Sequence, residues 1–148
     1  MVHFDIKPQQ MMLNADGTLL INDLNLVRFP NADKDGNSCP FRCGASGVDS
    51  WRAPENIAGE YLTEKVDIYG MAMVYYCMVA LFAPYTDVPD GTGNIKKGMP
   101  PTVDPSWHAG FVEILRDMWH PNPKARPSAR RVVQRLEILQ QHLAMETV

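Results

Sequence analysis

The sequence predicts a mainly α-helical fold with one small β-hairpin near its start. Three segments, at residues 66–81, 106–118 and 129–143, show sustained apolar runs or apolar residues at helical spacing. Two short apolar runs flank an Asp-Gly pair at residues 16–17, which is typical of a tight hairpin turn. At 148 residues the chain has the length of one domain and can bury a core.

The first third of the chain is expected to contain the hairpin and two irregular segments. The block His3–Gln10 is polar, and Pro8 forbids a helix through it. The strands of the hairpin are predicted at Met11–Leu13 and Thr18–Ile21. From Asn31 to Asp49 the chain is rich in Gly, Asn, Asp and Ser and has no periodicity. We expect a long loop there, and loops of this length are commonly functional or disordered.

Helical signals begin after this loop. Thr63 can cap a helix that opens at Glu64 and has residues 66–81 as its body. A Pro- and Gly-rich connection follows, with at most a short helical turn near Asn94–Lys97. Ser106 or a neighbour is predicted to start a helix that runs through Met118.

Ser128 is predicted to cap the last helix. The apolar residues of this helix are spaced to share one face, and they are Val132, Val133, Leu136, Leu139 and Leu143.

Composition excludes several classes of protein. A formal net charge of -3 argues against a nucleic-acid partner. Three cysteines are too few for a disulfide scaffold, and Cys39 and Cys43 have no second pair that would complete a zinc site. The first residues lack the pattern of a signal peptide, which favours a cytoplasmic, intracellular location. The uncharged segment that includes residues 68–83 could form either a membrane span or a buried core helix, and its pattern alone leaves both open.

Two charged residues in the opening block could carry chemistry. Asp5 could accept a proton, and Lys7 could neutralise negative charge on a phosphate. Asp23, at the end of the second strand, could hold a divalent metal. Taken alone, an Asp-x-Lys sequence is weak evidence for a site, and an exposed ion pair is the favoured interpretation.

The order of these residues along the chain resembles the signature of eukaryotic-type protein kinases. His3-Phe4-Asp5-Ile6-Lys7-Pro8 comes first, followed by Asp23, by Ala53-Pro54-Glu55, by Asp67 and by the run from Asn122 to Pro127. The resemblance extends from His3 to about Leu139. It implies a kinase-like C-terminal lobe, and it assigns residues 68–83 to a core helix, so we expect no membrane span.

The resemblance also implies roles for individual residues. Asp5 corresponds to the catalytic Asp that orients the substrate hydroxyl and accepts its proton, and Lys7 to a lysine that contacts the γ-phosphate of ATP. Asp23 corresponds to the Mg²⁺-binding Asp, and Gln10 stands where a second metal ligand, normally Asn, is expected. Lys7, Gln10 and Asp23 are therefore the expected contacts to ATP and Mg²⁺.

Four further residues have structural roles by the same resemblance. Glu55 and Arg126 correspond to a buried ion pair, Asp67 to a brace on the catalytic-loop backbone, and His3 to the first residue of the catalytic motif.

The sequence departs from the family pattern at several positions. Gln10 adds a methylene to the expected Asn, which predicts weaker binding of a second metal. Leu24 and Asn25 replace Phe and Gly after Asp23. We expect Leu24 to fill an apolar slot and Asn25 to tolerate positive φ.

Residues 1–148 are thus interpreted as a partial protein kinase domain, from the catalytic loop to the last helix of the C-terminal lobe. The leading hypothesis is an ATP-dependent kinase that phosphorylates protein Ser or Thr in its complete form, with little activity in this chain alone. The alternative is a non-catalytic, pseudokinase-like lobe that acts as an interaction module. In that case a protein partner would bind the exposed apolar face of the lobe.

Overall fold

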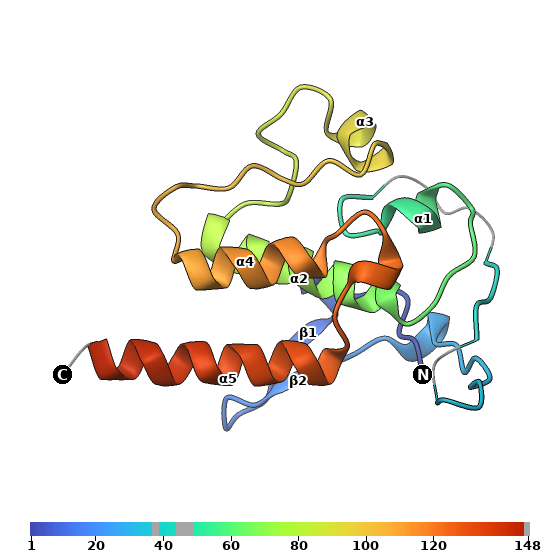
Figure 1. Cartoon of the computed structure of the whole chain (residues 1–148), viewed down its shortest axis with the longest axis horizontal. Helices are drawn as coiled ribbons and strands as arrows, with labels where there is room; N and C mark the ends of the chain where they lie inside the picture. Colours follow the sequence, from blue (N-terminus) through green and yellow to red (C-terminus); the bar gives the residue numbers. More distant parts are fainter. Residues whose placement is uncertain (37–38, 44–48, 147–148) are drawn as a thin grey trace.

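The structure is a computed structural model that describes residues 1–36, 39–43 and 49–146. In chain order the elements are η1 (Pro8–Gln10), β1 (Met11–Leu13), β2 (Leu19–Ile21), η2 (Leu24–Leu26), α1 (Pro54–Ile57), α2 (Lys65–Ala80), α3 (Gly91–Lys96), α4 (Ala109–Met118), η3 (Pro123–Ala125) and α5 (Ala129–Glu146), where η marks a 3₁₀ turn. Figure 1 shows α4 in front of α2, α5 below them with the small sheet behind it, and α3 near α1. The predicted mainly helical class with one small hairpin is confirmed.

Helix α2 is the centre of the core. Its sequence is apolar on every side, and consecutive residues such as Ile68, Tyr69 and Gly70 are all buried. Helix α4 packs against α2 with Leu115 and Met118, and both of these side chains are fully buried. Because α2 is covered from several directions, it provides a rigid support for the loops at its first turn.

The predicted hairpin is confirmed. Strands β1 and β2 pair antiparallel, with Met11 opposite Ile21 and Leu13 opposite Leu19. Gly17 has a φ of +83°, which glycine adopts without strain, and this allows the tight reversal between the strands. The hairpin therefore carries the chain from η1 directly back to Asp23.

The predicted helices are present, with shifted ends. Helix α4 begins at Ala109 and not at Ser106, because the imidazole of His108 accepts a hydrogen bond from the N–H of Gly110 and acts as the cap. Helix α3 starts three residues before the predicted turn, where Asp90 caps it. The hydroxyl of Ser128 accepts a hydrogen bond from the N–H of Arg131, as a cap of α5 should.

The apolar face of α5 is only partly covered. Val132 is buried, and Leu136 and Leu139 pack against the core, but Val133 and Leu143 are exposed. The core therefore covers only part of the apolar face predicted for this helix, and the rest of that face is exposed to solvent.

The loop predicted at residues 31–49 has no helix among its described residues, and Phe41 within it forms a bridge with Leu62. Within the described residues no three His, Cys, Asp or Glu side chains gather as they would around a metal ion. Among those same residues, no helix combines the length and the apolar character that a membrane span needs.

Candidate active site

The segment that contains the sequence-predicted acid, residues 3–7, is held by the first turn of α2. Asp67 accepts hydrogen bonds from two successive backbone N–H groups, that of His3 at 2.6 Å and that of Phe4 at 2.8 Å. Phe4 has a φ of +72°, which is costly for a residue with a side chain. The Asp67 carboxylate offsets this cost by satisfying both N–H groups. Burial raises the pKa of Asp67, although these two hydrogen bonds oppose the rise.

His3 connects this segment to the end of the hairpin. Its Nδ1 accepts the N–H of Asp5 at 3.3 Å, and its Nε2 lies 3.0 Å from the carbonyl oxygen of Asn22. Because a carbonyl can only accept, the ring proton belongs on Nε2. The buried imidazole thereby fixes the spacing between Asp5 and the residue that follows Asn22, which is Asp23.

Asp5 is surrounded by three donors. The Nζ of Lys7 lies 2.7 Å from its Oδ2, the amide nitrogen of Gln10 donates to the same oxygen at 2.9 Å, and a guanidinium nitrogen of Arg52 lies 3.5 Å from Oδ1. Burial acts to raise the pKa of Asp5. The hydrogen bonds from Lys7 and Gln10, and the charges of Lys7 and Arg52, nevertheless hold it below its ordinary value. Asp5 is therefore ionised at neutral pH.

Asp23 joins the same group of side chains through Gln10. The Nε2 of Gln10 donates to Oδ2 of Asp23 at 3.0 Å. The carboxylate of Asp23 and the amide oxygen of Gln10 are both oxygen ligands of the kind Mg²⁺ prefers, and a magnesium site commonly uses few protein ligands and completes its shell with water and phosphate oxygens. Residues of these types could hold Mg²⁺ together with phosphate oxygens.

Two expectations for the residues after Asp23 are wrong. The positive φ falls on Asp23 itself, at +62°, and Asn25 lies inside the turn η2. Leu24 is largely exposed, so it does not fill a closed apolar slot. The left-handed residue lies two positions earlier than expected, at Asp23 instead of Asn25.

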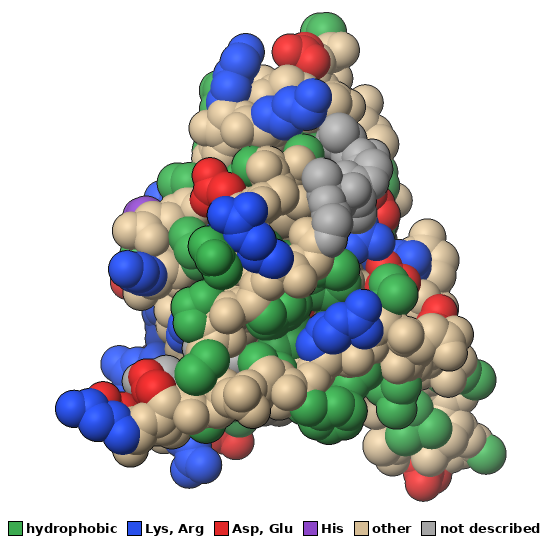
Figure 2. All heavy atoms as spheres, turned by 90° about the vertical axis from the view of Figure 1, so that its right-hand side faces the viewer, with side chains coloured by type: hydrophobic (Ala, Val, Ile, Leu, Met, Phe, Trp, Pro, Cys, Tyr) green, Lys and Arg blue, Asp and Glu red, His purple; other side chains and the backbone are tan. Residues whose placement is uncertain are grey.

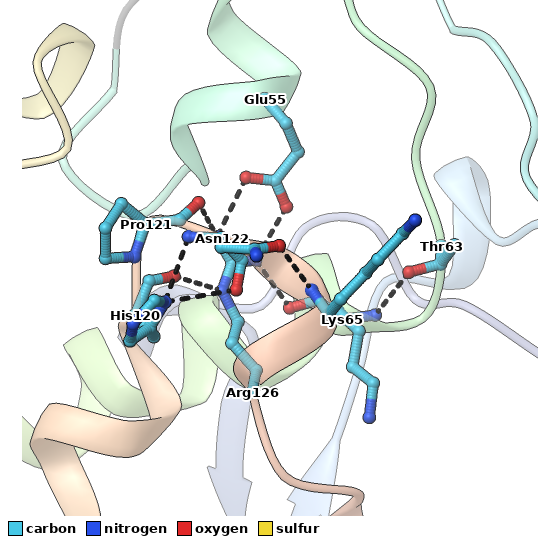
Figure 3. A network of polar contacts seen from close by, with 8 residues as sticks. Glu55, Thr63, Lys65, His120, Pro121, Asn122 and Arg126 are labelled. Atoms are coloured by element: carbon cyan, nitrogen blue, oxygen red, sulfur yellow. Dashed lines mark hydrogen bonds and ion pairs between the residues drawn. The ribbon is translucent and has the colours of Figure 1, made fainter.

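Glu55 and Arg126 form a bidentate ion pair. The two guanidinium nitrogens of Arg126 lie 2.6 and 2.8 Å from the two carboxylate oxygens of Glu55, and both side chains are buried. As Figure 3 shows, Glu55 extends from α1 and meets Arg126 near the first turn of α2. The pair ties the segment after the long loop to the chain that leads into α5.

Arg52 was not among the residues predicted for the site. It lies just before α1, and besides its contact with Asp5 it donates to the carbonyl oxygen of Phe4 at 3.4 Å. Its guanidinium also lies over the Phe4 ring, 6.0 Å from the centroid. Its position directly before Ala53-Pro54-Glu55 was the one available signal, and it does not show where the side chain points.

A family model described as protein kinase domain matches residues 1–136. The chain belongs to the protein kinase family. Among its relatives is mitogen-activated protein kinase kinase kinase 12 of Rattus norvegicus, which is 30% identical over 142 residues. That match covers 93% of this chain and 15% of the rat protein.

Two further relatives also match over most of this chain but over only a small part of their own length. Dual specificity protein kinase shkA of Dictyostelium discoideum is 27% identical over 92% of this chain and 26% of its own length. Mitogen-activated protein kinase kinase kinase 13-A of Xenopus laevis is 27% identical over 93% of this chain and 14% of its own length. The chain thus spans about a quarter or less of the length of these relatives.

Proposed function

We propose that this chain contributes the catalytic loop and metal-holding residue of an ATP-dependent protein kinase that phosphorylates Ser or Thr side chains. The observation that carries the proposal is the convergence of Asp5, Lys7, Gln10 and Asp23 into one set of interacting side chains. Protein kinase domains transfer the γ-phosphoryl group of ATP with the help of Mg²⁺. Transfer of this kind depends on positioning and electrostatics, and these four side chains supply acceptor oxygens and a cation at one place.

Each residue has a proposed task. The carboxylate of Asp5 would accept a hydrogen bond from the substrate hydroxyl and then its proton, and its lowered pKa keeps the acceptor oxygens unprotonated. Lys7 would turn its ammonium from Asp5 to the transferred phosphate. Asp23 would hold Mg²⁺, and the bound ion would neutralise charge on the phosphate oxygens. The presence of Lys7 two residues after Asp5 supports Ser or Thr as the acceptor.

The test is a phosphotransfer assay with γ-labelled ATP and a generic protein substrate. It uses this chain both alone and joined behind the segment that precedes the matching region in the rat relative. Asp5→Asn should reduce transfer on the order of a hundredfold or more, as expected for loss of a general base. Asp35→Asn changes an exposed carboxylate and should have no effect. Equal activity of Asp5→Asn and the unchanged joined protein would contradict the proposal.

A second candidate function is a non-catalytic interaction module. The observation that favours it is the exposure of large apolar side chains, among them Leu13, Leu19 and Phe29. A chain that binds no Mg-ATP in calorimetry but retains a specific protein partner would support the module. Nucleotide binding that is lost in Asp23→Asn would support the kinase.

A further inference from the structure

Gln10 lies between the two acids of the candidate site. Its side chain is buried, and one amide nitrogen donates both to Oδ2 of Asp5 at 2.9 Å and to Oδ2 of Asp23 at 3.0 Å. An amide nitrogen has two hydrogens, so a single NH₂ group can make both bonds. The amide therefore joins two carboxylates that would otherwise repel each other.

The orientation of this amide follows from its partners. Ionised carboxylates only accept hydrogen bonds, so an amide turned the other way would place its oxygen against two anions. Gln10 can offer its oxygen to a metal at this place only after its amide has turned over. That rotation breaks both hydrogen bonds to the carboxylates.

We propose that Gln10 competes with the divalent metal for the two carboxylates and so weakens metal binding at Asp23. This inference rests on the proposed function, because it takes Asp23 as the residue that holds Mg²⁺. The NH₂ group occupies the position between the acids that a cation would favour, and it partly satisfies their charge without a net charge of its own. A metal that binds Asp23 must first displace this donor.

If Gln10 were instead a metal ligand, its removal would weaken metal binding. Turning the amide exchanges two charge-assisted hydrogen bonds for one neutral oxygen ligand. Mg²⁺ readily keeps water in place of such a ligand, because it dehydrates reluctantly. The exchange therefore favours the amide as a competitor, and removal of the amide should strengthen metal binding.

The experiment measures the binding of Mg²⁺, and of Mn²⁺ as a spectroscopic probe, to the 148-residue chain without nucleotide. The variant is Gln10→Met, which keeps a side chain of similar length but can neither donate these hydrogen bonds nor offer an oxygen. We expect the metal affinity of this variant to rise roughly tenfold, because the metal no longer has to displace the Gln10 amide. A factor of about ten corresponds to the net free energy of about one hydrogen bond. Its melting temperature without metal should fall, and saturating metal should raise it more than in the unchanged chain.

The matched control is Gln9→Met, which changes the neighbouring exposed amide and should leave metal affinity unchanged. Circular dichroism checks folding, and Gln10→Ala replaces Gln10→Met if the latter does not fold. Lower metal affinity in the Gln10 variant would identify Gln10 as a ligand. Equal affinity in the two chains would show that Gln10 does not compete with the metal, and so would a lack of metal binding in both. Each of these results overturns the inference.

Asp23→Asn, introduced into the unchanged chain and into Gln10→Met, separates this inference from the proposed function. Loss of metal binding in both backgrounds places the metal at Asp23 and leaves the comparison at Gln10 to decide the competition. Retention of metal binding in Asp23→Asn would contradict the metal role of Asp23 in the proposed function.

Discussion

At the scale of single residues, Arg126 has the most fully satisfied charge among the site residues described above. Besides its two bonds to Glu55, its Nη1 donates to the carbonyl oxygen of Lys65 at 3.0 Å and its Nε to that of His120 at 2.8 Å. The guanidinium also lies 5.0 Å from the ring centroid of Tyr69. A buried ion pair adds little net stability when both partners are present, but loss of one partner leaves an unpaired buried charge.

Arg126→Met is accordingly expected to destabilise the chain by about 3–5 kcal/mol, because the carboxylate of Glu55 remains buried without its partner. Urea unfolding followed by circular dichroism measures this change. Arg130→Met, at an exposed position of α5, should change stability by less than about 0.5 kcal/mol. The double variant Glu55→Met/Arg126→Met should recover part of the loss. A double variant less stable than Arg126→Met would contradict the argument from an unpaired charge.

The sequence allows some of these residue contacts to be predicted and leaves others unpredictable. The order of motifs led to the pairing of Glu55 with Arg126, and this contact is present. The contact of Arg52 with Asp5 depends on how the loop before α1 folds back over Phe4, and no local pattern encodes that path. The hydrogen bonds from Gln10 to Asp5 and Asp23 require the extra methylene of Gln. They also require two carboxylates that are 18 residues apart in the sequence to lie close together.

At the scale of elements, the close approach of α2 to residues 3–7 depends on Gly70. A Cβ at this position would lie 3.0 Å from the carbonyl oxygen of Ile6 and 3.1 Å from its Cβ. Both atoms belong to the loop that carries Asp5 and Lys7. Glycine inside a helix normally costs up to about 1 kcal/mol relative to alanine, so its presence here reflects the need for close packing.

Gly70→Ala should therefore destabilise the chain by about 1–3 kcal/mol, because the overpacking exceeds the gain in helix propensity. Gly110→Ala in α4 is the matched control. There the new Cβ would lie 3.3 Å from the ends of the His108 and Leu139 side chains, which can move. We expect its stability to stay the same or to rise slightly in urea unfolding. A stabilised Gly70→Ala would show that the loop can shift away from α2.

Element positions were predictable where periodicity or turn chemistry is strong. The hairpin, α2 and α5 follow from an Asp-Gly turn, a long apolar run and a Ser cap. Helix α1 has four residues, too few for a periodic signal, and its Pro54 start was the one indication of a helix. The start of α4 was placed too early because a His cap is a weaker sequence signal than Ser.

At the scale of the whole molecule, many large apolar side chains remain exposed on the described structure, several of them in the hairpin. Figure 2 shows hydrophobic side chains gathered on a hollowed face. A hollow of about 400 Å³ is lined by residues of the opening segment, α2 and α5, and also by Ile21 of β2 and Leu24. In the hairpin, Leu13 is 70% exposed and its cross-strand partner Leu19 is 56% exposed. Apolar surface of this extent is typical of a face that binds another protein surface.

This chain should therefore associate with itself through the hairpin as its concentration rises. Leu13→Lys with Leu19→Glu places opposite charges across the strands, which preserves the pairing and the net charge while removing apolar surface. Size-exclusion chromatography with light scattering, over a tenfold concentration range, should show the variant shifted toward the monomer with a nearly unchanged melting temperature. Met78→Lys with Met145→Glu removes two apolar side chains outside the hairpin that are each 68% exposed, and it should leave association unchanged. Equal effects of the two double variants would show that exposed apolar area in general, and not the hairpin, drives association.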